Sequence, residues 1–203
     1  MNNSEAFEKI YTTRAWGAWP ASGSGSTKHQ TSVLSAKLPQ VIDRLDVKSI
    51  LDCGCGDLNW MPDVDLCDCS YIGYDVSPSV VDDLKRRFPD KDLRVGDICD
   101  DKLPPADLAL CRDVLVHLPF EKIWDFLRNL KKNSVKYLAT TSFTGRRTNV
   151  DCSVGDWRTL NFEAAPFNFP LPEISLNERL GEHDPNYYDK STCVWAVDSL
   201  SLT

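Results

Sequence analysis

The chain has 203 residues, of which 42% are hydrophobic and 26% are charged. These are ordinary values for a globular protein, and the length suits one domain with a single buried core. The 30 acidic and 23 basic residues give a net charge of −7, which lacks the basic footprint of nucleic-acid-binding proteins and disfavours such a partner. No stretch approaches the roughly 18 apolar residues of a membrane-spanning helix, which disfavours a membrane protein.

The N-terminal segment and the cysteines bear on the cellular compartment. Residues 1–17 carry early acidic residues and no apolar signal core, so we expect a cytoplasmic protein. The eight cysteines then favour reduced thiols over disulfides. The pairs Cys53/Cys55 and Cys67/Cys69 leave a gap of one residue, shorter than the usual two to four of a zinc knuckle, so no metal site is predicted.

Residues 1–47 are predicted to form a helical cover. A short amphipathic helix is expected at 6–11, followed by a Ser/Gly-rich turn at 22–27. A second helix has apolar residues at helical spacing between Val33 and Leu45, and Pro39 is expected to break or kink it.

From residue 48 onward, short apolar runs alternate with helical patterns, which is typical of βαβ units and a parallel sheet. We expect strands at 48–52, 70–75, 92–95, 106–111 and 135–143, and helices at 77–88 and 120–131. Residues 144–172 look irregular, with arginines, Trp157 and a Pro/Phe-rich run, and are expected to form a lid. Two further strands, at 173–177 and 193–197, would complete a mostly parallel seven-stranded sheet in an α/β fold.

The segment that carries chemistry is Ile50–Asp57, a strand followed by glycines at alternate positions. Gly54 and Gly56 lack the Cβ atoms that would block a ligand at the carboxyl end of the strand. A second strand ends about 20 residues later in Asp75, whose carboxylate could accept both hydroxyls of a ribose. Together these features predict an adenosine cofactor, although strand-end aspartates also cap turns.

Two nucleoside cofactors compete for this site. A dinucleotide site uses the pattern G-x-G-x-x-G, but here the third glycine position is Asn59. Asp57 also adds a negative charge where a pyrophosphate would lie. A nicotinamide-dependent oxidoreductase is therefore kept only as an alternative.

Four motifs in order resemble those of class I S-adenosylmethionine-dependent methyltransferases. The run 51–56, LDCGCG, resembles their first motif, and Asp75 matches the second. Residues 96–98 resemble the third motif, and 107–118 the motif at the fourth strand. The runs CRDVLVHL (111–118) and 157–170 look most similar to bacterial small-molecule or glycan-type enzymes. The resemblance implies a Rossmann-like three-layer αβα sandwich spanning 1–203, with a cover (1–47), a cofactor-binding core (48–143) and a substrate lid with the last strands (144–203).

The resemblance also implies which residues bind the cofactor. Asp52, Gly54 and Gly56 would line its methionine moiety, and Asp75 would hold the ribose. Asp97 would accept from the adenine amino group, with Ile98 against the ring. The further contacts expected on this basis are Cys55, Val76, Cys111, Arg112 and Trp16.

Catalysis and acceptor binding are expected at the end of the fourth strand and in the lid. Asp113 and His117 are the candidate bases, four residues apart. Asp113 could instead belong to the cofactor shell, and His117 could be a residue satisfied by a backbone carbonyl. The residues expected to contact the acceptor are Trp60, Arg146, Trp157 and Arg158, although surface arginines are commonly just solvated.

The predicted activity is methyl transfer from S-adenosylmethionine to a small polar acceptor, a sugar or specialised metabolite, with S-adenosylhomocysteine as the product. Two alternatives stay open. The first is a non-catalytic S-adenosylmethionine-binding sensor or partner subunit, and the second is a protein or RNA methyltransferase. The acceptor itself and the oligomeric state are beyond what these motifs indicate.

Overall fold

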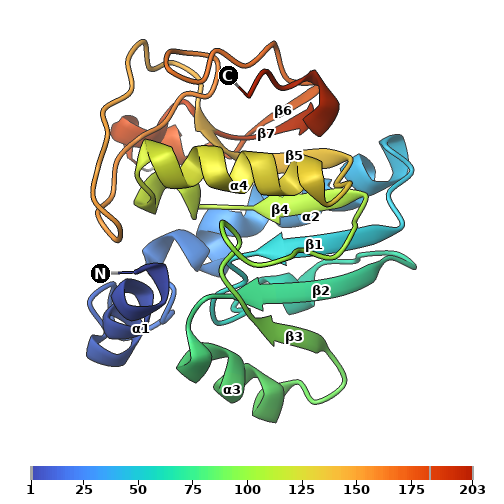
Figure 1. Cartoon of the computed structure of the whole chain (residues 1–203), viewed down its shortest axis with the longest axis vertical. Coiled ribbons are helices and arrows are strands. Elements are labelled where there is room, and N and C mark those ends of the chain that lie inside the picture. Colours follow the sequence, from blue (N-terminus) through green and yellow to red (C-terminus); the bar gives the residue numbers. More distant parts are fainter. Residues whose placement is uncertain (1, 183, 203) are drawn as a thin grey trace.

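The computed structural model describes residues 2–182 and 184–202, and within them the chain forms one seven-stranded sheet of order β3-β2-β1-β4-β5-β7-β6 (Figure 1). Neighbouring strands among β1 to β5 pair in parallel, whereas β7 runs antiparallel to both β5 and β6. This confirms the predicted mostly parallel α/β fold. The strands are β1 (Ser49–Cys53), β2 (Ser70–Asp75), β3 (Asp92–Val95), β4 (Leu108–Cys111), β5 (Tyr137–Phe143), β6 (Ile174–Asn177) and β7 (Lys190–Ala196).

Helices cover both faces of the sheet, as a three-layer sandwich requires. The α-helices are α1 (Asn3–Thr13), α2 (Lys28–Arg44), α3 (Pro78–Arg87) and α4 (Phe120–Lys132). The apolar side chains of α4 pack in one core cluster, together with strand residues such as Leu51 and Ala109. Those of α2 and α3 pack in a second cluster with Ile50 and Leu108. Successive strand residues therefore point to opposite faces, and both faces are buried.

Helix α2 continues through Pro39, so of the predicted break or kink the break is wrong, and the kink stays a prediction. Proline removes one backbone donor from the helix and usually disrupts it. Here the turns on both sides are anchored by buried Leu34, Leu38, Val41 and Ile42, whose packing against the sheet outweighs the missing hydrogen bond.

The last strand begins earlier than predicted, which changes what lies at the edge of the sheet. β7 starts at Lys190, three residues before the expected Cys193, and its register pairs Phe143 with Lys190. Because β7 is antiparallel to β5, its first residue lies beside the carboxyl end of β5. Lys190 is thus placed where ligands bind in open α/β sheets.

The carboxyl edge of the sheet is covered by elements from outside the parallel core. Helix α1 lies beyond the ends of β1 and β2 (Figure 1). Between β1 and β2, where a helix would usually follow the glycine turn, the chain forms only the short 3-10 turn Met61–Asp63. Among the described residues, no helix is both long and apolar enough to cross a membrane.

Candidate functional site

A cavity of about 530 Å³ lies at this edge, within the size range of small-molecule sites. Its walls come from α1, from the Ser/Gly segment 22–26 and from the loops that follow β1, β2, β3 and β4. The predicted site residues that line it are Trp16, Gly54, Cys55, Gly56, Trp60, Asp75, Val76, Asp97, Ile98, Arg112, Asp113, His117 and Trp157.

The glycine turn after β1 has a backbone that requires glycine. Gly54 and Gly56 have φ angles of 83° and 57°, in the left-handed region that other residues rarely adopt. A Cβ atom on Gly54 would lie 2.4 Å from the Cγ2 atom of Val114. The amide of Gly54 donates to the Tyr74 carbonyl at 2.8 Å, which ties the turn to the end of β2.

Asp75 ends β2 and presents a buried carboxylate to the cavity. It is 4% exposed and accepts hydrogen bonds from the amides of Gly56 and Ser77, each at 3.0 Å. Burial raises the pKa of this carboxyl to about 6, and the backbone hydrogen bonds partly oppose the rise. The carboxylate is therefore ionised at neutral pH and rigidly held.

Asp97 follows β3 and is joined there by a residue that sequence reasoning missed. Its carboxylate accepts from the Cys99 amide at 2.9 Å and from the Nδ2 atom of Asn3 at 2.9 Å. Asn3 belongs to α1, lines the cavity and is 5% exposed. Its other side-chain atom, Oδ1, is buried and has no hydrogen-bond partner within the described chain.

The Ser/Gly segment 22–26 is bound from two sides, which excludes the role of a free linker. Asp57 accepts from the Ala21 amide at 2.7 Å and from the Ser22 hydroxyl at 2.5 Å. The side-chain amide of Asn59 donates to the Ser26 carbonyl at 2.9 Å. The charge of Asp57 and the amide at the third glycine position thus hold this segment against the cavity.

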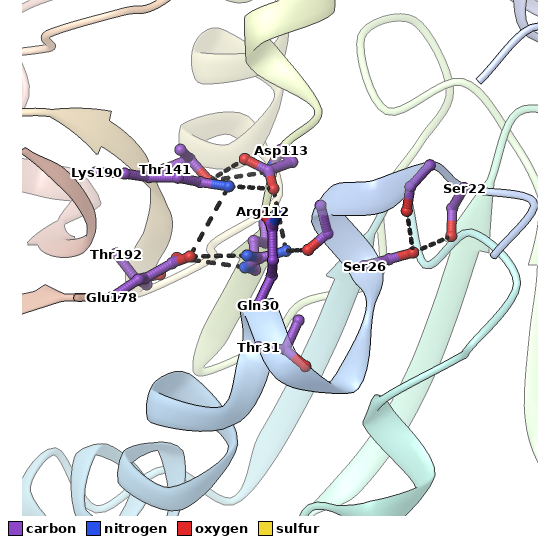
Figure 2. Close-up of polar contacts among 12 residues, drawn as sticks. Ser22, Ser26, Gln30, Thr31, Arg112, Asp113, Thr141, Glu178, Lys190 and Thr192 are labelled. Atoms are coloured by element: carbon purple, nitrogen blue, oxygen red, sulfur yellow. Dashed lines mark hydrogen bonds and ion pairs between the residues drawn. The ribbon is translucent and has the colours of Figure 1, made fainter. Parts of the chain in front are cut away.

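Arg112, Asp113, Glu178 and Lys190 form a charge cluster, and three of them, Arg112, Asp113 and Lys190, line the cavity (Figure 2). Arg112 donates to both carboxylate oxygens of Glu178, at 2.7 and 3.3 Å. Lys190 donates to Asp113 at 2.6 Å and lies 3.8 Å from Glu178. The two cations and two carboxylates balance, as buried charges must.

Glu178 and Lys190 were not expected from the sequence. They lie on either side of the hairpin between β6 and β7, whose register pairs Asn177 with Ser191. Glu178 also accepts from the Thr192 hydroxyl at 2.8 Å. The sequence signal for this pair was the opposite charge of two residues that lie close to the adjoining ends of the strands predicted at 173–177 and 193–197.

Asp113 is a fixed anion of the charge cluster and a poor candidate base. Burial alone would raise the pKa of its carboxyl, but Arg112 and Lys190 hold it well below its usual range. Its backbone has a φ of 56°, and its amide donates to the Thr141 hydroxyl at 2.9 Å. A group that stays ionised so far below neutral pH has little tendency to take a proton.

His117 has the properties of a base. Its Nδ1 atom lies 2.9 Å from the Asp156 carbonyl oxygen, which accepts only, so Nδ1 carries the hydrogen. Burial lowers the pKa of the imidazole, although the hydrogen bond to Asp156 opposes the shift. The ring is neutral at pH 7, and its Nε2 atom is left as an acceptor. Trp16 covers the ring at a centroid distance of 4.7 Å.

Four predicted site residues do not line the cavity, and two of them lie in β1 and β4. Asp52 accepts from the Tyr71 hydroxyl at 2.6 Å, and burial raises the pKa of its carboxyl to about 7. Cys111 is 0% exposed and packs in the core under α4. Side chains alternate between the two faces of a sheet along each strand, and this alternation directs the side chains of Asp52 in β1 and Cys111 in β4 away from the cavity.

The other two are Arg146 and Arg158, whose side chains bind other groups of the protein. Arg146 forms an ion pair with Asp189 at 3.0 Å. Arg158 donates to the Leu115 carbonyl at 2.7 Å and to the Leu118 carbonyl. Arg158 therefore fixes the 3-10 turn Leu115–His117, and with it the position of His117, the last residue of that turn.

Trp157 and Tyr187, which follow β5 in the chain, form an aromatic part of the cavity wall. Trp157 is 50% exposed, and its ring lies 6.0 Å from that of Tyr187 and 6.1 Å from that of Phe143. Phe167 and Phe169, which belong to the Pro/Phe-rich run, pack in the core. All eight cysteines are unpaired, and no three His, Cys, Asp or Glu side chains of the described residues are grouped so that they could hold a metal ion.

Comparison with known proteins agrees with this geometry. Residues 51–134 match the protein family described as Methyltransferase domain. Curated protein sequences contain no match to the chain.

Solved structures share the fold. A TehB-like SAM-dependent methyltransferase from Corynebacterium glutamicum aligns over 95% of this chain and 97% of its own, with 18% identity and a TM-score of 0.53. Human N-acetylserotonin methyltransferase in complex with SAM aligns over 78% of this chain with 19% identity and a TM-score of 0.55. The match spans 51%, about half, of the human chain. The magnesium protoporphyrin IX methyltransferase of Synechocystis with bound SAM aligns over 74% of this chain and 81% of its own, with 14% identity and a TM-score of 0.50.

Proposed function

We propose that this protein is an S-adenosylmethionine-dependent methyltransferase that acts on a small polar acceptor. The observation that carries the proposal is one cavity in which a glycine turn, Asp75 and Asp97 meet the neutral imidazole of His117. The match of residues 51–134 to a methyltransferase family supports it.

The chain's own residues fit the cofactor. Asp75 would accept from both ribose hydroxyls, and Asp97 from the adenine amine. The side-chain amide of Asn3 donates to Asp97 at 2.9 Å and helps to hold that carboxylate in the cavity wall. The Ser/Gly segment and the turn at Gly54–Gly56 would enclose the methionine moiety. When bound, S-adenosylmethionine supplies an electrophilic methyl group, and S-adenosylhomocysteine remains after transfer.

His117 is proposed as the general base for a hydroxyl or ammonium acceptor. Nε2 of His117 would take the proton of a hydroxyl acceptor during transfer, whereas it would remove a proton from an ammonium acceptor beforehand, because an ammonium nitrogen has no lone pair. The Asp156 carbonyl stabilises the imidazolium through the Nδ1 hydrogen. Such a base contributes typically about 10² to 10⁴ in rate, and correct orientation of the acceptor contributes more.

Lys190 is proposed to position an oxygen atom of the acceptor. An ammonium has three donor hydrogens, and Asp113 takes one of them at 2.6 Å. Glu178 lies beyond hydrogen-bonding distance at 3.8 Å. The remaining donors, together with the aromatic wall of Trp157 and Tyr187, favour a sugar or an oxygen-bearing specialised metabolite. On this proposal, 1–47 cover the site, 48–143 bind the cofactor and 144–203 recognise the acceptor.

The deciding experiment is isothermal titration with S-adenosylmethionine, S-adenosylhomocysteine and NADH. Micromolar binding of the first two alone is the expected result. Binding of NADH alone would favour the oxidoreductase alternative. Tight S-adenosylmethionine binding without product formation across a panel of sugar, phenol and amine acceptors would favour a non-catalytic sensor or partner subunit.

A further inference from the structure

We propose that the acceptor of this site is a hydroxylated amine, whose ammonium group is held by Asp184 beside the rings of Trp157 and Tyr187. The inference rests on the proposed function and deepens it, because it assigns a charge to the acceptor. It is carried by the balance of charges in the cavity wall and by the place of Asp184 in that wall.

The cavity wall has an excess of negative charge. The charged residues that line it are five aspartates and two basic residues, namely Asp57, Asp75, Asp97, Asp113, Asp184, Arg112 and Lys190. Both cations form ion pairs with Asp113, and Arg112 also pairs with Glu178, so the charge cluster is neutral by itself. The other four aspartates accept hydrogen bonds only from uncharged donors of the described chain.

The cofactor would leave most of this excess in place. S-Adenosylmethionine has a sulfonium, an ammonium and a carboxylate, so its single net positive charge would offset one of the four unpaired aspartates. A cavity of one prevailing sign, enclosed by walls of low polarity, attracts ligands of the opposite charge. The cavity therefore favours a cationic acceptor over an anionic one.

Asp184 is the unpaired aspartate on the acceptor side. The other three follow β1, β2 and β3 in the cofactor-binding core, whereas Asp184 lies in 144–203 and precedes the 3-10 turn Pro185–Tyr187. Its Oδ1 atom accepts from the Asn186 amide at 2.9 Å, and its Oδ2 atom has no hydrogen-bond partner among the described residues. The side chain is partly buried and lines the cavity, so a ligand can supply a donor or a positive charge.

Two aromatic rings favour the same kind of ligand. Trp157 is half-exposed and lines the cavity, and its ring lies 6.0 Å from that of Tyr187 at an angle of 72°. The faces of such rings attract cations, and tryptophan does so most strongly. Burial raises the pKa of the Tyr187 phenol, and the charges of Asp184 and Asp113 add to the rise, which shows that both carboxylates act at this ring.

Lys190 is compatible with a cationic acceptor. Its ammonium is matched by Asp113 at 2.6 Å, so it offers hydrogen-bond donors without an uncompensated charge. A neutral hydroxyl can accept from it. A carboxylate or phosphate ester would gain little from Lys190 and would be repelled by Asp184.

The test uses two probes of the same shape, choline and the isostere in which a tert-butyl group replaces the trimethylammonium. Each is titrated by calorimetry into protein saturated with S-adenosylhomocysteine. Wild-type protein is expected to bind choline on the order of 10-fold more tightly than the uncharged isostere. Asp184→Asn should lower this ratio about threefold, as expected for a partly exposed ion pair, and Trp157→Leu by a similar factor.

The matched control is Glu182→Gln. Glu182 belongs to the same segment, but it is exposed and is not among the residues that line the cavity. Because salt screens such an exposed charge, the variant should retain the wild-type ratio.

Equal affinities for the two probes, or no detectable binding of either at millimolar concentration, would overturn the inference. A wild-type ratio in Asp184→Asn would overturn it as well, because choline would then be selected by other groups. In each of these cases the proposed function stands as long as S-adenosylhomocysteine binds. Failure of S-adenosylhomocysteine itself to bind would overturn the proposed function, and the inference with it.

Discussion

The affinity for S-adenosylhomocysteine should weaken below pH 6, because the carboxylate of Asp75, which we propose binds the ribose, becomes protonated. Burial raises the pKa of Asp75 from 3.8 to about 6 in the free protein. Both carboxylate oxygens already accept from the amides of Gly56 and Ser77, and the ionised form must also accept from the ribose. Binding to the ionised form alone makes the dissociation constant roughly tenfold larger at pH 5 than at pH 8.

Tyr11 and Glu8, which interact with Asp75, do not produce this pH dependence. Burial raises the pKa of Tyr11 well above its usual value, and the charge of Asp75 adds to the rise. The pKa of Glu8 is lowered, because the hydrogen bonds of Ser77 and Ser79 outweigh the effect of burial. Neither group titrates between pH 5 and 8.

The assay is isothermal titration from pH 5 to 8 with the wild type and Asp75→Asn. The variant should bind on the order of 10-fold to 100-fold more weakly at pH 8, because it loses charge-assisted hydrogen bonds. Its affinity should change little with pH, and any residual slope belongs to Asp52, whose pKa is about 7, or to His117, whose pKa is lowered by burial. Equal slopes in the two proteins would refute the assignment of Asp75 to the ligand.

Three further predictions concern catalysis and stability. His117→Gln should lower kcat about 10² to 10⁴-fold and leave S-adenosylhomocysteine affinity nearly unchanged, and an unchanged kcat would remove His117 as the base. Glu178→Leu should lower the free energy of unfolding in urea by about 3 to 5 kcal/mol, because Arg112 loses its buried partner. The exposed control Asp92→Asn should cost less than about 1 kcal/mol, and similar losses would contradict the argument. Asp52 has a folded pKa of about 7 against 3.8 unfolded, so its ionisation penalty is absent below pH 3.8 and complete above pH 7. Asp52→Asn should therefore stabilise the protein by up to about 4 kcal/mol at pH 8 and hardly at pH 4, and a pH-independent effect would count against burial as the cause.

Local patterns were sufficient to predict the sheet and several residues that line the cavity. The turn at Gly54 and Gly56 and the strand-end Asp75 could be recognised because their spacing reflects backbone geometry. The side-chain direction of Cys111 could not, since all of β4 is apolar and buried on both faces and shows no alternation.

The charge cluster and the contact of α1 with the cavity depend on tertiary pairing that no local pattern contains. Glu178 and Lys190 meet Arg112 only through the register of β6 and β7. Asn3 lies in the first turn of a helix, where a polar residue is commonplace. Its place in the cavity wall is recognised only from its contact with Asp97. The continuity of α2 through Pro39 is likewise decided by packing against the sheet.

The charge cluster also affects the order in which parts of the chain fold while the protein is being synthesised. Glu178 follows Arg112 by 66 positions, and Lys190 follows Asp113 by 77. When the five parallel strands have left the ribosome, the guanidinium of Arg112 still lacks its main counter-ion, and burying it then would be unfavourable. We therefore expect the nascent chain to keep this edge of the sheet open until the β6–β7 hairpin has emerged. A ribosome-bound chain stalled before that hairpin would then have its glycine turn but no finished cavity.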